Sequence, residues 1–78
     1  QSYTDVPVVG VLHQSGELAV RVEKVWFDKP VEERTAEALA LGEQVASQFD
    51  DPGITVELRD PSNHVHGIVV GERIRWFD

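Results

Sequence analysis

Apolar and polar residues alternate along the first third of the chain. The segment PVVGVLH (7–13) is short and rich in β-branched residues, and the Ser-Gly pair in QSGE (14–17) is typical of a tight turn. LAVRVEKVWF (18–27) begins with a regular alternation that changes phase near 23–24. Such a change indicates a bulge, or a strand end that is covered on both faces. The pattern predicts a β-hairpin with arms 7–13 and 18–27.

A helical period follows in DKPVEERTAEALALGEQVASQF (28–49). Pro30 in the first turn and the two glutamates after it indicate the start of a helix, because proline and acidic residues are favoured there. DDPG (50–53) ends the helix, since proline cannot continue it. Gly42 lies on the apolar stripe, so we expect the helix to approach a sheet closely. The stripe consists of Val31, Thr35, Ala38, Leu39, Gly42, Val45, Ala46 and Phe49.

The last third of the chain returns to strand patterns. ITVELR (54–59) alternates apolar and polar residues, and DPSN (60–63) has the composition of a turn. From 64 to 77 the pattern fits either one long strand or two strands that meet at Gly71. Glycine is the preferred first residue of a two-residue type II′ loop. The pattern therefore favours two strands.

The element order strand, strand, helix, strand, strand, with a further C-terminal strand, predicts the fold class. We expect an α+β two-layer sandwich, in which an antiparallel sheet of four or five strands carries one helix on one face. With 78 residues the chain is expected to form a single domain spanning 1–78. It contains no methionine, so we interpret it as a processed product or a fragment of a longer chain. The second sheet face must be polar, or be covered by a partner, a second copy or the rest of that chain.

Charge and composition exclude several classes of function. The formal net charge is −7, and the basic residues form no stripe along the sequence, so we expect no nucleic-acid partner. No segment has the roughly 18 consecutive apolar residues that span a bilayer, and we expect no membrane partner. The absence of cysteine excludes disulfides, thiol nucleophiles and thiolate metal sites. An acidic surface is usually a solubility feature, but it also permits docking on a basic protein.

Two segments, RVEKVWFD (21–28) and GERIRWFD (71–78), both end in Trp-Phe-Asp. The match indicates either a duplicated hairpin unit or a coincidence of three residues. Neighbouring residues of a strand point to opposite faces, so one ring of each pair should face the helix and the other solvent. Exposed aromatic rings favour protein binding. The candidate binding residues are Trp26, Phe27, Trp76 and Phe77.

His64 and His66 would share one face of a regular strand, which permits joint ligation of a metal. Asp60 and the distant His13 are candidates for the remaining ligands. The competing interpretation is a pair of solvated polar residues, because an HxH pattern is common by chance. Ser62 completes the residue types of a hydrolase triad with Asp60 and His64, but a triad draws its members from separated elements and these residues occupy one turn.

These observations predict a non-enzymatic module without a cofactor, because so small a chain with no convergent set of polar residues has little room for a catalytic site. We expect it to bind protein, including a second copy of itself, through the sheet face or edge that the helix leaves uncovered. One alternative is a metal- or small-ligand-binding domain that uses His64, His66 and His13. Another is an acidic inhibitor or immunity-type protein that docks on a basic partner.

Overall fold

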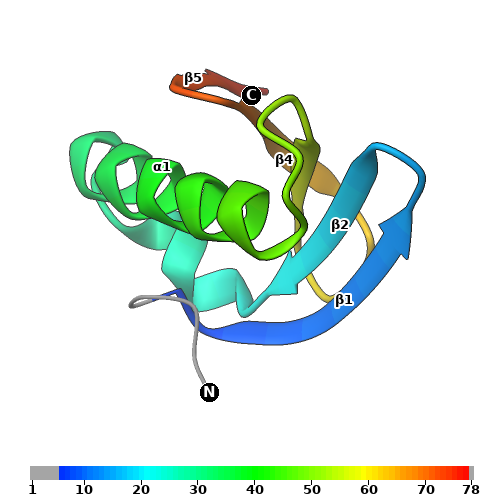
Figure 1. Cartoon of the computed structure of the whole chain (residues 1–78). Coiled ribbons are helices and arrows are strands. Elements are labelled where there is room, and N and C mark those ends of the chain that lie inside the picture. Colours follow the sequence, from blue (N-terminus) through cyan, green and yellow to red (C-terminus); the bar gives the residue numbers. More distant parts are fainter. Residues whose placement is uncertain (1–5, 78) are drawn as a thin grey trace.

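The computed structural model describes residues 6–77 and contains one five-stranded sheet and one α-helix. Figure 1 shows the helix lying across one side of the sheet, as the sequence predicts. The α+β fold class is thereby confirmed. In chain order the elements are β1 (Val8–Gln14), β2 (Glu17–Val22), the 3₁₀ helix η1 (Lys24–Asp28), α1 (Val31–Gln48), β3 (Thr55–Arg59), β4 (Val65–Val70) and β5 (Arg73–Trp76).

The strands lie in the order of the chain, from β1 at one edge to β5 at the other. Three of the four strand pairs are antiparallel, but β2 and β3 are parallel. The prediction of an antiparallel sheet is therefore wrong at its centre. The reason is the crossover: α1 carries the chain back along the sheet, so β3 starts at the same end as β2.

Both predicted hairpin turns are present. Gln14 pairs with Glu17 across a Ser-Gly loop, and Val70 pairs with Arg73 across the loop that starts at Gly71. Gly71 has a φ of 61°, and the following residue is not among those with positive φ. This is the backbone pattern of a type II′ turn. The predicted break at Gly71 is confirmed.

The strand predicted over 18–27 is shorter than expected. β2 ends at Val22, and η1 follows it. This turn brings Trp26 under α1, where its side chain is only 2% exposed and its Nε1 donates a hydrogen bond of 2.7 Å to Glu37 Oε1. The change of phase in the sequence thus marks a change of element rather than a bulge within a strand.

The helix also starts later than the sequence indicates. Pro30 is the N-cap of α1, and Val31 is its first residue. Lys29 has extended backbone angles, φ −66° and ψ 155°, because a residue before proline avoids the helical region. Asp28, the first residue of the predicted helical segment 28–49, therefore belongs to η1 and not to α1.

The core lies between α1 and one face of the sheet. Gly42 lets the helix approach closely, because a Cβ atom at this position would lie 2.7 Å from Val69 Cγ1. Leu41 is fully buried although it was not placed on the predicted stripe, whereas Val31 on that stripe is exposed. The buried hydrophobic cluster comprises Val6, Leu18, Val20, Val22, Trp26, Ala38, Leu41, Val45, Ile54, Val56, Leu58 and Val69.

Candidate functional site

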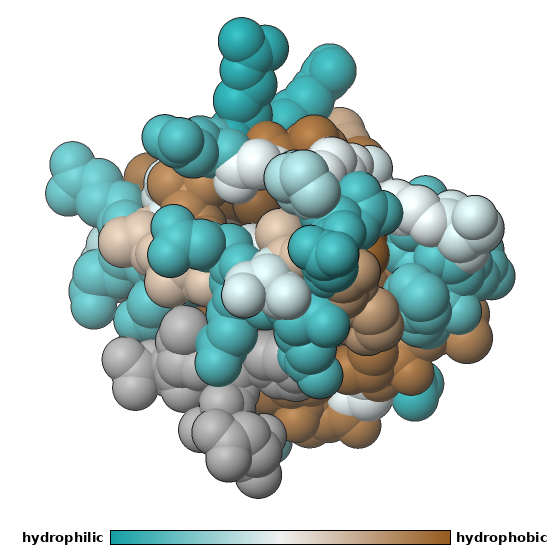
Figure 2. Space-filling view, in the orientation of Figure 1, coloured by the Kyte–Doolittle hydropathy of each residue, from teal (hydrophilic) through white to brown (hydrophobic). Residues whose placement is uncertain are grey.

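The free edge at β1 carries the most exposed large apolar side chains of the described strands. Val9, Val11 and Leu12 are 52%, 47% and 55% exposed. Figure 2 shows hydrophobic surface along the lower right margin, where Figure 1 places β1. An edge strand presents unpaired backbone groups, and exposed apolar side chains beside them favour pairing with another chain. The β1 edge is therefore a candidate contact surface.

The two edges of the sheet differ. β5 is only four residues long and has exposed arginines at its first and third positions, Arg73 and Arg75. Short, charged edge strands resist pairing. β1 has seven residues and contains no charged Asp, Glu, Lys or Arg. Its pairing with β2 is irregular between Val8 and Gly10 but regular from Gly10 to Gln14, so the regular segment is the part that an added strand could extend.

The sheet face that α1 does not cover, here called the open face, carries several arginines. In each strand the arginines alternate with residues whose side chains point toward α1, so the arginine side chains lie on the opposite face. The strand register pairs each arginine with a residue that also lies on the open face. Four of the seven Lys and Arg residues lie here, beside two glutamates: Arg21, Arg59, Arg73 and Arg75 with Glu17 and Glu57.

Arg21 lies in a row that runs across three strands from the β1 edge. It pairs in register with Gly10 on one side and with Arg59 on the other. Its guanidinium reaches over Gly10, because a Cβ atom there would lie 2.8 Å from Arg21 Nη2. Among the described residues Arg21 has no hydrogen-bond or ion-pair partner, whereas the Nε of Arg59 donates to Glu57 Oε1 at 3.0 Å.

A hollow of about 240 Å³ opens between these arginines and the edge strand. Apolar residues and two arginines share its wall, and the Nη1 of Arg59 donates to Asn63 Oδ1 at 3.5 Å. A guanidinium offers several N–H donors in a planar fork that matches a carboxylate. The lining residues are Val11, Leu12, Ala19, Arg21, Arg59 and Asn63.

Asp60 and His66, which the sequence offered as metal ligands, do come together. Asp60 Oδ2 lies 2.9 Å from His66 Nε2, and Asp60 Oδ1 accepts the backbone N–H groups of Ser62 and His64 at 2.8 and 3.1 Å. The hydrogen bond to His66, more than those from the backbone, holds the pKa of Asp60 below its ordinary value, while burial acts in the opposite direction. Phe27 stacks on His66 with 4.1 Å between ring centroids.

The third predicted ligand lies elsewhere. His13 pairs with Leu18 in the register of β1 and β2, and its ring stacks on Phe49 at 4.4 Å between centroids. His64 lies in a different part of the fold, directly before the first residue of β4. Within residues 6–77 no three His, Cys, Asp or Glu side chains are placed to hold a metal ion. Asp60 and His66 instead fasten the turn between β3 and β4. Ser62 takes part in this turn through its backbone N–H, which donates to Asp60 Oδ1.

The four predicted aromatic binding residues do not form one patch. Trp26 is buried, and Phe27 packs against the core and meets Trp26 edge to face at 5.1 Å. Trp76 also packs against the core, and its Nε1 donates to Thr35 Oγ1 at 3.0 Å. Phe77 is 39% exposed, and the Arg75 guanidinium lies 5.7 Å from its ring centroid. Phe77 is thus the ring of this set that offers the most surface to a partner.

Glu37 joins η1 to α1. Its carboxylate accepts hydrogen bonds from Trp26 Nε1 and, at 3.0 Å, from Lys29 Nζ. The bond from Trp26 is the main cause that lowers the pKa of Glu37, with burial opposing it and Lys29 adding a smaller effect. The buried indole N–H thereby has its acceptor, and this polar group has a structural role.

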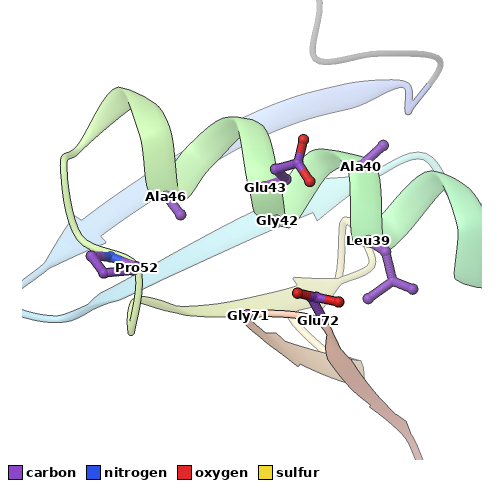
Figure 3. A pocket seen from close by; sticks show the side chains of 8 residues that line it. All are labelled: Leu39, Ala40, Gly42, Glu43, Ala46, Pro52, Gly71 and Glu72. Carbon is purple, nitrogen blue, oxygen red and sulfur yellow. The ribbon is translucent and has the colours of Figure 1, made fainter.

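A second hollow, of about 500 Å³, lies between α1 and the turn that joins β4 to β5. Figure 3 shows Leu39 pointing from the helix toward Glu72, while Ala46 lies near Pro52 at the other end of the hollow. Glu43 on the helix is the other acidic residue of its wall. This second hollow lies at the opposite edge of the sheet from β1. The groups that line it do not converge on one point as hydrogen-bond partners for a ligand. The lining residues are Leu39, Ala40, Gly42, Glu43, Ala46, Pro52, Gly71 and Glu72.

Sequence reasoning identified an uncovered face or edge but missed the arginines of the open face. Each arginine alternates with apolar neighbours in its own strand, so its face was readable from parity. The pairing of Arg21 with Arg59 depends on the register between β2 and β3, which sequence patterns did not supply. The exposed edge at β1 had a signal: VVGVLHQ is apolar and lacks Asp, Glu, Lys and Arg.

No protein-family model, curated protein or solved structure matches the chain. Function is therefore inferred from the chain's own surface. In the described part of the chain, no helix has the length and apolar character needed to cross a membrane.

Proposed function

We propose that the protein is a non-enzymatic binding module that recognises another protein by adding a strand of it to β1. The observation that supports this function is the regular Gly10–Gln14 segment at a sheet edge that no other strand of residues 6–77 pairs with, with Val11 and Leu12 each about half exposed. Strand addition obtains affinity from main-chain hydrogen bonds and specificity from alternate side chains.

The side chains of β1 suit such a partner on both faces of the sheet. Val11 pairs in register with Val20, whose side chain belongs to the core, so Val11 lies on the helix side. Leu12 pairs with Ala19 on the open face. An added strand would therefore find an apolar neighbour on each face. Fully burying one aliphatic side chain contributes about 1.5–3 kcal/mol, and these two are already half covered, so we expect weak, reversible binding.

A neutral strand peptide tests this proposal. We would titrate the ¹⁵N-labelled protein with the acetylated and amidated peptide Thr-Val-Val-Gln-Val-Val-Thr and follow the backbone amides by NMR. The expected shifts concentrate in β1 and β2. Leu12→Lys should weaken binding at least tenfold, because it places a charge where the strand must pack.

Val25→Lys provides the matched control. Val25 is 67% exposed but lies in η1, which is not paired with the Gly10–Gln14 segment, so the change to lysine should alter affinity less than twofold. Shifts confined to the groove around Leu39 and Glu72, or equal losses in the two lysine variants, would contradict strand addition at β1.

A further inference from the structure

We infer that the partner of β1 is an acidic strand, which places an Asp or Glu carboxylate beside Gly10 where the Arg21 guanidinium binds it. This inference rests on the proposed function above. It specifies the partner as an extended segment of another protein. This segment carries a carboxylate on the open face and an apolar side chain two residues along the same strand.

The first argument is geometric. A strand added to β1 lies about 4.8 Å from it, and its side chains continue the rows of the existing sheet. The row of Gly10 has no side chain at β1, and the Arg21 guanidinium from β2 occupies this space. The partner residue of that row therefore meets the guanidinium as its nearest side chain.

The second argument is electrostatic. Arg21 and Arg59 pair in register on neighbouring strands, and like charges in this arrangement repel. Glu57 neutralises Arg59, but in the described part of the chain Arg21 has no such counter-ion. A carboxylate at the edge supplies the missing charge, and the planar guanidinium fork can bind it through two N–H donors.

The neighbouring row sets the next residue of the partner. Leu12 is 55% exposed, and Ala19 behind it is 7% exposed, so this row is apolar at the edge. The hollow between the two rows joins these apolar groups to the guanidinium groups of Arg21 and Arg59. Glu suits this shape because its methylene groups and its carboxylate would meet apolar and basic walls respectively.

A second copy of the chain does not fit this description through β1. The β1 sequence VVGVLHQ has no acidic residue, so pairing two β1 strands would bring no carboxylate to either Arg21. It would instead add a second unneutralised guanidinium to the joined sheet. The charge of the row favours an acidic partner over self-association.

Peptides that differ at one residue test the inference. We would measure dissociation constants for acetylated and amidated Thr-Val-Val-X-Val-Val-Thr with X as Glu, Gln or Lys. We expect the Glu peptide to bind at least tenfold more tightly than the Gln peptide, and the Lys peptide to bind more weakly than either. Arg21→Gln should reduce the preference for Glu over Gln to less than twofold.

Two further variants keep the test specific. Gly10→Ala retains every charge but adds the Cβ atom that would displace the guanidinium, so it should reduce the preference at least threefold. Arg73→Gln removes a charge of the open face at the β5 edge and should leave the preference unchanged. The unfolding midpoint of each variant is measured to verify that it is folded.

The outcomes separate the two proposals. Equal affinity of the Glu, Gln and Lys peptides at β1 would overturn the acidic partner while strand addition stands. If no peptide shifts the β1 amides, strand addition itself fails. An equal loss of preference in Arg21→Gln and Arg73→Gln would assign the effect to the general field of the face and overturn the specific role of Arg21.

Discussion

At the residue scale, Arg21 is an exposed side chain that makes no hydrogen bond or ion pair with the described fold. It is exposed, it lies beside Arg59 in the register, and it has no acceptor among residues 6–77. Glu37 shows the opposite case, because its carboxylate accepts hydrogen bonds from both the Trp26 indole N–H and Lys29 Nζ. Polar side chains of the protein thus divide into those that stabilise the fold and those that remain available to a partner.

Replacing Arg21 should therefore not weaken the fold. We expect Arg21→Gln to leave the free energy of unfolding unchanged or to raise it by about 0.2–1 kcal/mol, because it removes a repulsion between paired strands. Urea unfolding followed by tryptophan fluorescence measures this. A loss above about 1 kcal/mol would show that Arg21 has a stabilising partner.

The Asp60 carboxylate gives a prediction with a definite sign. Its pKa in the folded protein lies below the ordinary value because His66 and two backbone N–H groups stabilise the charged form. This stabilisation is present above the ordinary pKa and is lost as the pH falls through the lowered pKa of the folded state. Asp60→Asn should therefore be less stable than the natural sequence near neutral pH, and the difference should shrink in acid.

Thermal unfolding of both proteins between about pH 7 and about pH 2 measures this difference. Glu37 titrates with the same sign in both proteins, so its contribution cancels in the comparison. A difference in stability that stays constant over the whole range would contradict the role given to the Asp60 charge.

At the scale of elements, the arrangement depends on how closely α1 approaches the sheet. Gly42 is the point of contact, opposite Val69 of β4. The hydrophobic stripe predicted this approach, since glycine on an apolar helix face otherwise costs about 1 kcal/mol relative to alanine. β1 lies at the edge of the sheet, and its apolar side chains Val9, Val11 and Leu12 stay exposed.

Gly42→Ala should destabilise the protein by about 1 kcal/mol, although alanine is the better helix former. The added methyl group must displace Val69, and overpacking of a core costs about 1–3 kcal/mol, more than the gain in helix propensity. Chemical denaturation of Gly42→Ala, Val69→Ala and the double variant forms a mutant cycle. A coupling energy near zero would show that the two residues do not touch.

Patterns within one element were predictable from the sequence, and relations between elements were not. The break at Gly71 and the end of the helix at 50–53 follow from local turn chemistry. The parallel pairing of β2 with β3 does not, because alternation within a strand is the same for either direction. η1 was missed because Trp26 leaves the strand to bury its ring and to reach Glu37.

The same division applies to the candidate site. The apolar character of β1 is visible in its residues, but its position at an edge follows from the order of five strands. Asp60 and His66 were predictable neighbours because one turn joins them, whereas His13 could not be placed without the register. The convergence of Arg21 and Arg59 required the parallel pair.

At the scale of the whole molecule, the charge is unevenly distributed. The chain has a formal net charge of −7, yet the described strands place four arginines and only two glutamates on the open face. These two glutamates are the only acidic residues of the five described strands. Such a distribution orients an approaching acidic segment toward the open face and disfavours its approach elsewhere.

Salt should reveal this orientation. Raising the sodium chloride concentration from about 0.02 to about 0.5 M shortens the screening length to a few ångströms and should weaken binding of the Glu peptide at least threefold. Binding of the Gln peptide should change less than twofold. Isothermal titration at the two concentrations measures both, and a salt-insensitive Glu peptide would contradict recognition by charge.

Hydrogen exchange at the β1 amides, measured by NMR with and without saturating Glu peptide, tests strand addition to β1 most directly. An added strand should slow exchange at least tenfold at outward-pointing amides between Gly10 and Gln14, while amides of β5 keep their rates. Unchanged exchange in β1 with the peptide bound, or slower exchange at β5 instead, would contradict the proposal that this protein recognises its partner by extending its sheet.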